Sequence, residues 1–210
     1  MSKTAIVIVA RDPRGAKRRL RNVLAPAERE ALSRAMLADV LAACRGTRAD
    51  VLVVTESAAV ARMAHVAGAR VHRTDTKGTR ACARIGIAVM AGRGADAVLV
   101  LPADLPLLRS ADVRRLLAAG ATDGLVAVAD RHGRGTNALL IRPPLALPAL
   151  FGPASFSAHV GAARRRGLRV RTPRIAGVRL DVDTPDDLRL LRQKRRIVGS
   201  RTAAVLRELG

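Results

Sequence analysis

The chain has 210 residues, of which 49% are apolar and 26% are charged, and its formal net charge at pH 7 is +21. This composition excludes a disordered chain and favours one folded domain with a full core. The excess charge has two explanations: a coding bias toward Arg and Ala, or an acidic partner such as phosphate, nucleic acid or a membrane surface. Two Phe and no Trp or Tyr leave almost no stacking platform, which argues against nucleic-acid binding.

Two further features concern the compartment. Cys44 and Cys82 lie far apart without metal-ligand spacing, so we expect two reduced core cysteines of an intracellular protein. The apolar run from Ala5 to Ala10 is too short for a signal peptide or a membrane span. We therefore expect a cytoplasmic protein that contacts no membrane.

Short apolar runs alternate with helical patterns along the chain. Continuous apolar runs indicate strands covered on both faces, and apolar stripes behind Pro or a capping residue indicate helices. In chain order, strands are expected at 4–10, 51–55, 70–72, 97–101, 125–129, 138–141, 168–171 and 179–182. Helices are expected at 26–44, 57–68, 79–91, 110–119 and 155–166, and from 184 onward. The expected N-cap residues are Ser57, Ser110, Ser155 and Thr184, the last in a capping-box pattern.

Helices between short buried strands predict an α/β fold, a three-layer sandwich with a mainly parallel sheet. We expect a single domain over residues 1–192, followed by a basic tail over 193–210 that is either a final helix or a frayed end. Ligands of such sheets bind beyond the carboxyl ends of the strands. That rule selects segments 11–20, 103–107, 131–137 and 181–184.

Three carboxylates in the later segments form one candidate group. Asp181 and Asp183 flank Val182 in an extended stretch, so alternation directs both side chains to one side. Asp104 follows the strongest predicted strand. Oxygen ligands without nearby His or Cys favour Mg²⁺ over zinc. Each carboxylate alone could be a turn or cap residue, but together at two strand ends they predict a divalent metal site.

The first loop is basic. Lys17, Arg18 and Arg19 follow Pro13 and Gly15 directly after the first strand. Bunched cations on a flexible turn suit a triphosphate, whose leaving pyrophosphate must be neutralised. The alternative is a solvated charge run. The loop lacks the glycine spacing of a P-loop, so it does not predict a classical ATPase.

Two polar segments offer backbone N–H groups and hydroxyls. These are Gly133 to Asn137 and Phe151 to Phe156. A helix N-terminus that carries Ser155, with Gly152 before it, suits an anion; plain turn and capping chemistry is the alternative. His159 is expected to pack on its helix or to be a secondary anion contact.

The motifs occur together in the order of one family. They are LPADLP at 101–106, GTNALL at 135–140, FGPASF at 151–156 with His159, and LDVDTPDDL at 180–188. Over about residues 5 to 191 the chain resembles the guanylyltransferases of coenzyme F-420 biosynthesis, which use 2-phospho-L-lactate, phosphoenolpyruvate or 3-phospho-D-glycerate. The resemblance implies a nucleotidyltransferase fold of the glycosyltransferase-A type, with GTP as donor, Mg²⁺ as cofactor and pyrophosphate as product.

The resemblance also implies roles for individual residues. Metal binding would fall to Asp104, Asp181 and Asp183, which would form the catalytic group with Lys17. Binding of the phosphorylated acid would fall to Thr136, Asn137, Gly152 and Ser155. Nucleotide binding would fall to Lys17, Arg19 and Gly78. A downstream deazaflavin-coenzyme ligation enzyme is implied as a partner.

Two segments depart from the family's pattern, and three alternatives stay open. Arg18 stands where the family often has Ser, and Thr79-Arg80 follows Gly78 where the family has Leu-Asn. The alternatives are a related nucleotidyltransferase with a sugar phosphate or molybdopterin as acceptor, a basic nucleic-acid-binding protein, and a pseudoenzyme.

Overall fold

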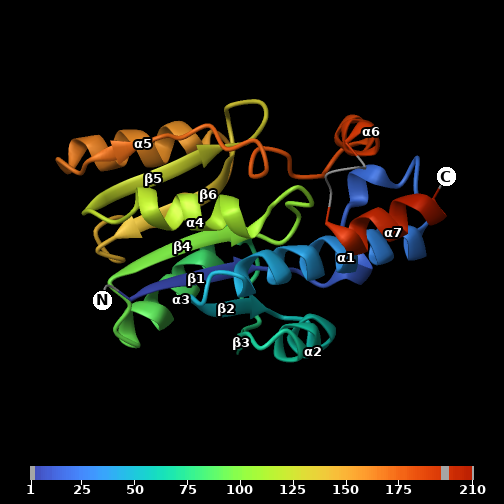
Figure 1. Ribbon diagram of the computed structural model, residues 1–210, viewed down its shortest axis with the longest axis horizontal. Coiled ribbons are helices and arrows are strands. Elements are labelled where there is room, and N and C mark those ends of the chain that lie inside the picture. Colours follow the sequence, from blue (N-terminus) through green and yellow to red (C-terminus); the bar gives the residue numbers. More distant parts are fainter. Residues whose placement is uncertain (1–2, 195–198, 210) are drawn as a thin grey trace.

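The computed structural model describes residues 3–194 and 199–209. A seven-stranded sheet in the order β3-β2-β1-β4-β6-β5-β7 forms its centre, and helices cover both faces (Figure 1). The strands are β1 (Thr4–Val9), β2 (Asp50–Thr55), β3 (Arg70–Arg73), β4 (Ala97–Pro102), β5 (Gly124–Ala129), β6 (Thr136–Arg142) and β7 (Val170–Arg171). The helices are α1 (Pro26–Arg45), α2 (Ala58–Val66), α3 (Thr79–Gly92), α4 (Ser110–Ala119), α5 (Ser155–Arg165), α6 (Pro185–Gln193) and α7 (Ser200–Glu208).

The sheet is mainly parallel, as predicted, and β6 is the strand that reverses. It pairs antiparallel with both β4 and β5, whereas the remaining pairs of neighbouring strands are parallel. An antiparallel strand begins at the edge where its parallel neighbours end. The start of β6, Thr136 and Asn137, therefore lies beside the carboxyl end of β4, at the edge of the sheet where ligands of this fold class bind.

Two apolar clusters fill the space between the sheet and its helices, which confirms the three-layer arrangement. On one face α1, α2 and α4 bury side chains such as Leu41, Val60 and Leu116 against the sheet. On the other face α3 and α5 do so with side chains such as Ile87 and Ala163. In Figure 1, α1 and α4 lie in front of the strands and α3 lies behind them.

A third apolar cluster lies beyond the sheet and holds the C-terminal segment. It joins Leu20 of the first loop and Met36 of α1 to Leu191 of α6 and Leu206 of α7. The segment expected to be either a final helix or a frayed end thus contains a helix, which packs on α1 (Figure 1). Residues 193, 194 and 199–209 of the predicted tail therefore belong to the packed unit, and 195–198 lie outside the described residues.

Several local predictions can be compared with the structure. Ser57 and Thr184 cap their helices as expected, and Asp187 completes the capping box of α6. Ser110 is not a cap, because α4 starts one residue earlier than expected, at Ser110 itself. Arg109 is the N-cap residue, and its backbone N–H donates to the Asp112 carboxylate.

Two further predictions were wrong. Ser155 is the first residue of α5, behind Ala154 as N-cap, because its hydroxyl is directed into the protein. Residues 179–182 form no strand. Side chains fix this segment instead of a neighbouring strand, since Asn137 donates to the carbonyl of Val178 and Arg179 donates to two carbonyls of the 130–131 loop.

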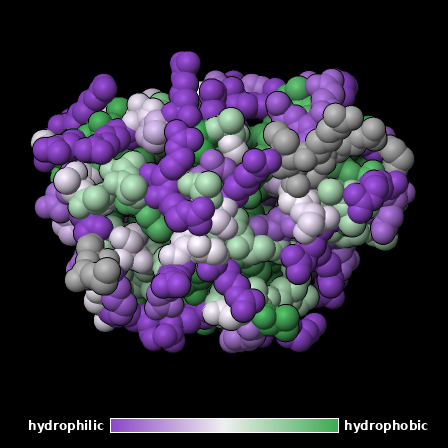
Figure 2. Space-filling view, viewed as in Figure 1, coloured by the Kyte–Doolittle hydropathy of each residue, from purple (hydrophilic) through white to green (hydrophobic). Residues whose placement is uncertain are grey.

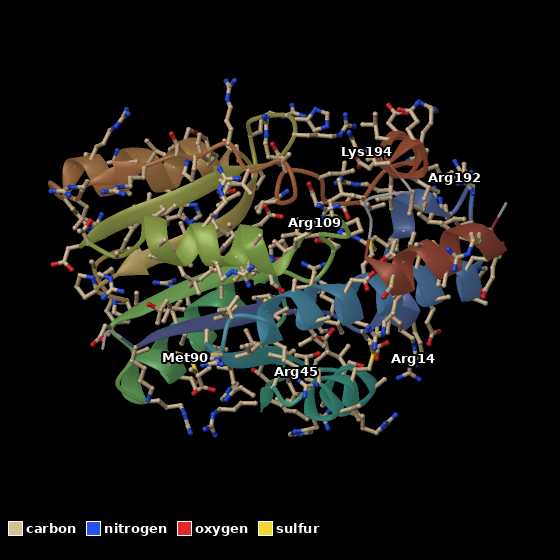
Figure 3. The ribbon with its side chains drawn as sticks, in the orientation of Figure 1. Arg14, Arg45, Met90, Arg109, Arg192 and Lys194 are labelled. Carbon is tan, nitrogen blue, oxygen red and sulfur yellow. The ribbon has the colours of Figure 1, made fainter. Side chains whose placement is uncertain are left out.

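The basic side chains are spread over the surface. Figure 2 shows hydrophilic residues over the whole visible face, and Figure 3 shows Arg14, Arg45 and Arg192 on separate elements. Cys44 and Cys82 are free and buried, as expected of core residues. Among the described residues no helix is long and apolar enough to cross a membrane.

Asp39 of α1 fixes the start of α7. Its side chain is buried, and its two oxygens accept the backbone N–H groups of Arg201 at 3.2 Å and Thr202 at 2.8 Å. We expect Asp39→Ala to lower the free energy of unfolding by about 1 to 2 kcal/mol, because the first turn of α7 loses its capping acceptor. Urea unfolding measures this. Glu30→Ala, which removes the same charge from an exposed pair on the same helix, should change stability by less than about 0.5 kcal/mol; equal losses would contradict the capping role.

Candidate active site

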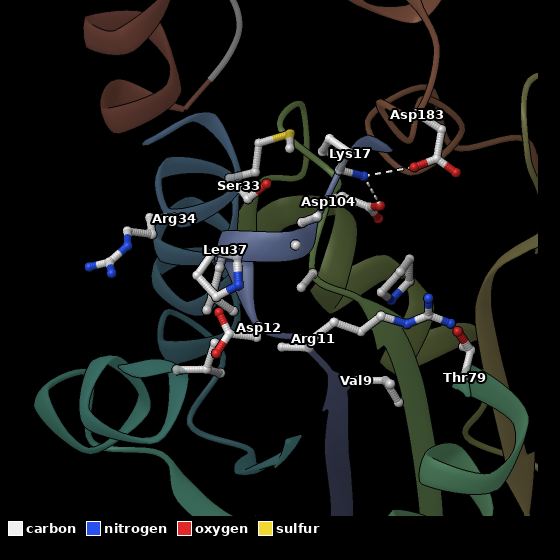
Figure 4. Close-up of a pocket in the computed structure, with 18 of the residues that line it drawn as sticks. Val9, Arg11, Asp12, Lys17, Ser33, Arg34, Leu37, Thr79, Asp104 and Asp183 are labelled. Atoms are coloured by element: carbon white, nitrogen blue, oxygen red, sulfur yellow. Dashed lines mark hydrogen bonds and ion pairs between the residues drawn. The ribbon is translucent and has the colours of Figure 1, made fainter. Parts of the chain in front are cut away.

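A buried ammonium group joins three separate segments at the carboxyl ends of the strands. The Nζ atom of Lys17 lies 2.5 Å from Asp104 Oδ2 and 2.8 Å from Asp183 Oδ1 (Figure 4). The Lys17 side chain is only 7% exposed, whereas Asp183 is 46% exposed. Burial alone would lower the pKa of Lys17, but the two carboxylates outweigh it and raise the pKa above its ordinary value. Lys17 is therefore a permanent cation.

The first loop is shaped to deliver Lys17. Residues Pro13–Gly15 and Arg18–Leu20 form two short 3-10 turns, and Lys17 between them adopts a left-handed backbone conformation with φ of 55°. Asp12 caps the first turn through the backbone N–H of Arg14 and also accepts from the Ser57 hydroxyl at 2.9 Å. A left-handed backbone conformation costs energy at any residue other than glycine. The ion pairs of Lys17 and the capped turns therefore hold the loop in this form.

A cavity of about 540 Å³ opens beside this ion pair. Its walls include Arg11, Arg18 and Arg19 of the first loop, with Glu56 after β2 and Thr79 at the start of α3. In Figure 4 the side chain of Arg11 extends across the cavity toward Thr79. The cavity thus combines a cationic wall with an acidic corner made by Asp104 and Asp183, which suits a charged, phosphate-bearing ligand.

Asp181 lies close to that acidic corner. Burial raises the pKa of Asp181, and the neighbouring Asp104 and Asp183 carboxylates raise it further, against a hydrogen bond of 3.0 Å from the Asn137 amide. Asp104 Oδ1 is buried and has no hydrogen-bond partner among the described residues. Carboxylate oxygens that repel one another and lack donors favour a cation.

The described residues do not hold a complete metal site by themselves. They contain no group of three His, Cys, Asp or Glu side chains arranged around a metal position. Asp104 and Asp183 each share one oxygen with Lys17, so few carboxylate oxygens are left for a cation. This count fits Mg²⁺, which proteins commonly bind through one or two carboxylates with water and substrate phosphates as the other ligands.

A second polar group surrounds His159, which is fully buried. The backbone N–H of Leu150 donates to His159 Nε2 at 2.7 Å, and His159 Nδ1 lies 3.1 Å from the Thr136 hydroxyl. Because a backbone N–H can only donate, the neutral ring carries its proton on Nδ1 and donates to Thr136. Ser155 also hydrogen-bonds Thr136, at 3.1 Å. The imidazole therefore orients both hydroxyls, and the network leaves one hydroxyl proton for a further acceptor.

Strand β6 links the two groups. Alternation along a strand sends the Thr136 side chain toward α5 and that of Asn137 to the opposite face. There the Asn137 amide donates to the Val178 carbonyl and to Asp181, both at 3.0 Å. The donors of Asn137 are thus engaged with the protein, and they set the position of Asp181.

The predicted site residues therefore lie in two adjoining places. The cavity is lined by Lys17, Arg19, Asp104 and Asp183. Thr136 and Ser155 lie in the second group, and Gly152 lies in the loop before it. Gly78 is the N-cap residue of α3, with φ of 96°, next to Thr79 on the cavity wall. The sequence predicts that His159 packs on its helix or contacts an anion. It gives no sign of the hydrogen bonds of His159 to Leu150 and Thr136, or of the contact from Arg80 to Phe151, because contacts between different elements leave no local pattern.

Comparisons with known proteins show the family of the chain. The family model described as "Guanylyl transferase CofC like" matches residues 4–209. The chain belongs to this family. The chain is 46% identical to the phosphoenolpyruvate guanylyltransferase of Rubrobacter xylanophilus, over 90% of this chain and 92% of that protein. It is 39% identical to the 3-phospho-D-glycerate guanylyltransferase of Phenylobacterium zucineum, over 97% and 95%.

Solved structures confirm the fold of this CofC-like transferase. A nucleotide-diphospho-sugar transferase from Desulfovibrio desulfuricans has a TM-score of 0.81 at 19% identity, over 99% of this chain and 95% of that one. Rv0371c from Mycobacterium tuberculosis, solved in complex with manganese, has a TM-score of 0.58 at 20% identity, over 91% and 98%. The nucleotidyltransferase fold expected from the sequence is thereby confirmed.

His159 makes the stability of the protein depend on pH. Burial lowers its pKa from 6.5 to about 4, and the charge of Arg80 acts in the same direction. The unfolded chain therefore binds this proton more readily, so the stabilisation is complete above the unfolded pKa and is lost as pH falls through the folded one. Between about pH 7.5 and pH 5 the wild type should lose about 2 kcal/mol more of its unfolding free energy than His159→Asn does.

Urea unfolding at the two pH values measures the difference. His65→Asn, at an exposed histidine, is the control and should follow the wild type. Parallel pH profiles for wild type and His159→Asn would show that the imidazole is not held neutral.

Proposed function

We propose that this protein transfers the guanylyl group of GTP to the phosphate of a small phosphorylated carboxylic acid: phosphoenolpyruvate, 3-phospho-D-glycerate or 2-phospho-L-lactate. The observation that carries the proposal is the Lys17 ammonium held between Asp104 and Asp183 at the mouth of a cationic cavity, in a chain of the CofC-like family. The family implies coenzyme F-420 biosynthesis, in which a deazaflavin-coenzyme ligation enzyme would consume the product.

The reaction is an in-line displacement at phosphorus. An oxygen of the acceptor's phosphate attacks the α-phosphorus of GTP and forms the new phosphoanhydride bond. The bond from the α-phosphorus to the bridging oxygen breaks, and pyrophosphate leaves with the electron pair. Phosphoryl-type transfer depends on positioning and charge neutralisation more than on a side-chain nucleophile. Lys, Arg, Asp and hydroxyl groups suffice for such a site.

The cations of the first loop would bind the triphosphate. An ammonium has three N–H donors, and Lys17 uses two of them on Asp104 and Asp183. The third can contact a phosphate oxygen, with Arg19 beside it on the cavity wall. Gly78, at the start of α3, would allow a phosphate or ribose group to approach the backbone closely. These groups neutralise charge on the leaving pyrophosphate.

The acidic residues fit a divalent cation, and Mg²⁺ is the ion we propose. Asp104 through its unpartnered Oδ1, Asp181, and the second oxygen of Asp183 would hold it. When bound, the ion polarises phosphoryl oxygens and aligns the reacting groups. Asn137 serves this arrangement by holding Asp181 in place.

The polar network around His159 would bind the phosphorylated acid. Thr136 supplies the free O–H donor, because Ser155 and the His159 Nδ1–H both donate to its oxygen and fix its orientation. Gly152, with φ of 139° and no side chain, lets an anion reach the loop before α5. On this proposal the acceptor would lie on the α5 side of β6 and the metal group on the other side.

A direct assay tests the function. The protein is incubated with GTP, Mg²⁺ and each of the three acids, and with the ligation enzyme to trap the product. We expect pyrophosphate release that requires an acid, and a guanylylated acid detected by mass spectrometry. Substituting ATP, CTP or UTP tests the donor. Acid-independent hydrolysis, or no product with any acid, would contradict the proposal.

Asp181→Asn tests the acidic group. Removing one carboxylate should lower kcat at least about 100-fold, because a bound dication supplies several kcal/mol of transition-state stabilisation. The same change relieves repulsion from Asp104 and Asp183, so the free energy of unfolding should hold or increase. Asp186→Asn makes the same charge change at an exposed position and should leave turnover within about twofold. Near-normal turnover in Asp181→Asn would exclude the proposed metal role.

A further inference from the structure

Arg80 connects the nucleotide side of the cleft to the acceptor side. It is the second residue of α3, just after the cavity-lining Thr79. Its Nε atom donates to the carbonyl oxygen of Phe151 at 2.7 Å, across 71 positions of the chain. The guanidinium is thus anchored to the loop that leads into α5.

The anchored guanidinium lies against the proposed acceptor group. A Cβ atom built on Gly152 would come within 3.1 Å of Arg80 Nη2, so the glycine leaves room for the guanidinium. The charge of Arg80 also reaches His159, whose pKa it helps to lower. Gly152 and His159 flank the Thr136 and Ser155 hydroxyls, so the positive charge lies beside them.

This charge has no acidic partner within residues 3–194 and 199–209. Arg80 donates to a neutral carbonyl through Nε, whereas a guanidinium has five N–H donors. The four donors of the two Nη groups are those that bind carboxylate and phosphate in pairs. A positioned guanidinium of this kind, next to two oriented hydroxyls, is suited to a small dianion.

We propose that Arg80 is a specificity-determining residue that binds an anionic group of the acceptor acid. The inference rests on the proposed function and adds to the acceptor site a cation supplied by α3. The Phe151 carbonyl fixes the guanidinium, and its Nη groups contact the carboxylate or the phosphate of the acid. Since α3 also borders the nucleotide cavity, the contact fixes the acceptor relative to the donor.

Steady-state kinetics of Arg80→Ala and Arg80→Lys test the inference. We expect Arg80→Ala to raise KM for the acid roughly 10- to 100-fold, the size of a lost charge-assisted hydrogen-bond pair, with KM for GTP within about twofold. Arg80→Lys keeps the charge without the paired donors and should recover part of the affinity. The control is Arg84→Ala, which removes the same charge one turn along α3 at an exposed position and should change neither KM.

Acids of different structure identify the anionic group. If Arg80 binds the carboxylate, Arg80→Ala should weaken the binding of 3-phospho-D-glycerate. Inhibition by glycerol 3-phosphate, which lacks the carboxylate, should then be unchanged. If Arg80 binds the phosphate, the binding of both compounds should weaken. An equal rise in KM for GTP and acid, or an unchanged KM for the acid, overturns the inference.

Calorimetry separates this inference from the function itself. Titrating wild type and Arg80→Ala with phosphoenolpyruvate gives a Kd without turnover, and we expect the variant to bind more weakly by the same factor. Equal Kd values overturn the role of Arg80 whether or not transfer occurs. If the wild type forms no product but the variant still binds the acid more weakly than the wild type, the anion contact is supported and the proposed reaction is contradicted.

Discussion

The arrangement of the cleft depends on one buried cation, the Lys17 ammonium between Asp104 and Asp183. Its partners follow β4 and precede α6, and Lys17 itself lies in the first loop, so a single group joins three segments that are remote in sequence. An ammonium that is 7% exposed is costly to bury unless it is paired. The pairing in turn allows two carboxylates to lie close together beside a cavity that otherwise carries positive charge.

Strand β6 is the second constraint, because it separates the hydroxyl and imidazole network from the acidic residues. Running antiparallel, it brings its first two residues to the ligand edge of the sheet. Thr136 then belongs to the hydroxyl and imidazole network on the α5 side, and Asn137 holds Asp181 on the other side. A strand of the opposite direction would present its last residues there, and the two groups would lose their common support. The reversal of β6 thus has a functional consequence.

The sequence predicts those parts of the fold that depend on local pattern. Strands β1, β2 and β4 follow from continuous apolar runs, and the caps at Ser57 and Thr184 follow from residue type and position. The failures arise where a distant side chain decides the local structure. Residues 179–182 pair with no strand, because the side chains of Asn137 and Arg179 fix this segment instead. Helix α7 is capped by Asp39, which lies more than 160 positions away.

The sequence predicts which residues form the candidate site better than it predicts the contacts among them. Motif order places the acidic and hydroxyl residues at strand ends, and the structure brings Asp104, Asp181 and Asp183 together as that order suggests. Periodicity gives no information about which of them Lys17 pairs with, or that His159 is buried with a fixed tautomer. Such contacts depend on angles between elements, which small differences in packing decide.

The charge of the chain acquires a physical role once the cleft is considered. The 38 Lys and Arg residues exceed the 17 Asp and Glu residues, and an excess of this size gives the surface a positive potential that attracts anions at long range. GTP and a phosphorylated acid are both anionic, so the field favours their approach without selecting between them. Selection has to come from the few positions where charge is fixed by contacts. Lys17 is fixed by two carboxylates and Arg80 by a carbonyl, and these two cations lie on the proposed donor and acceptor sides of the cleft.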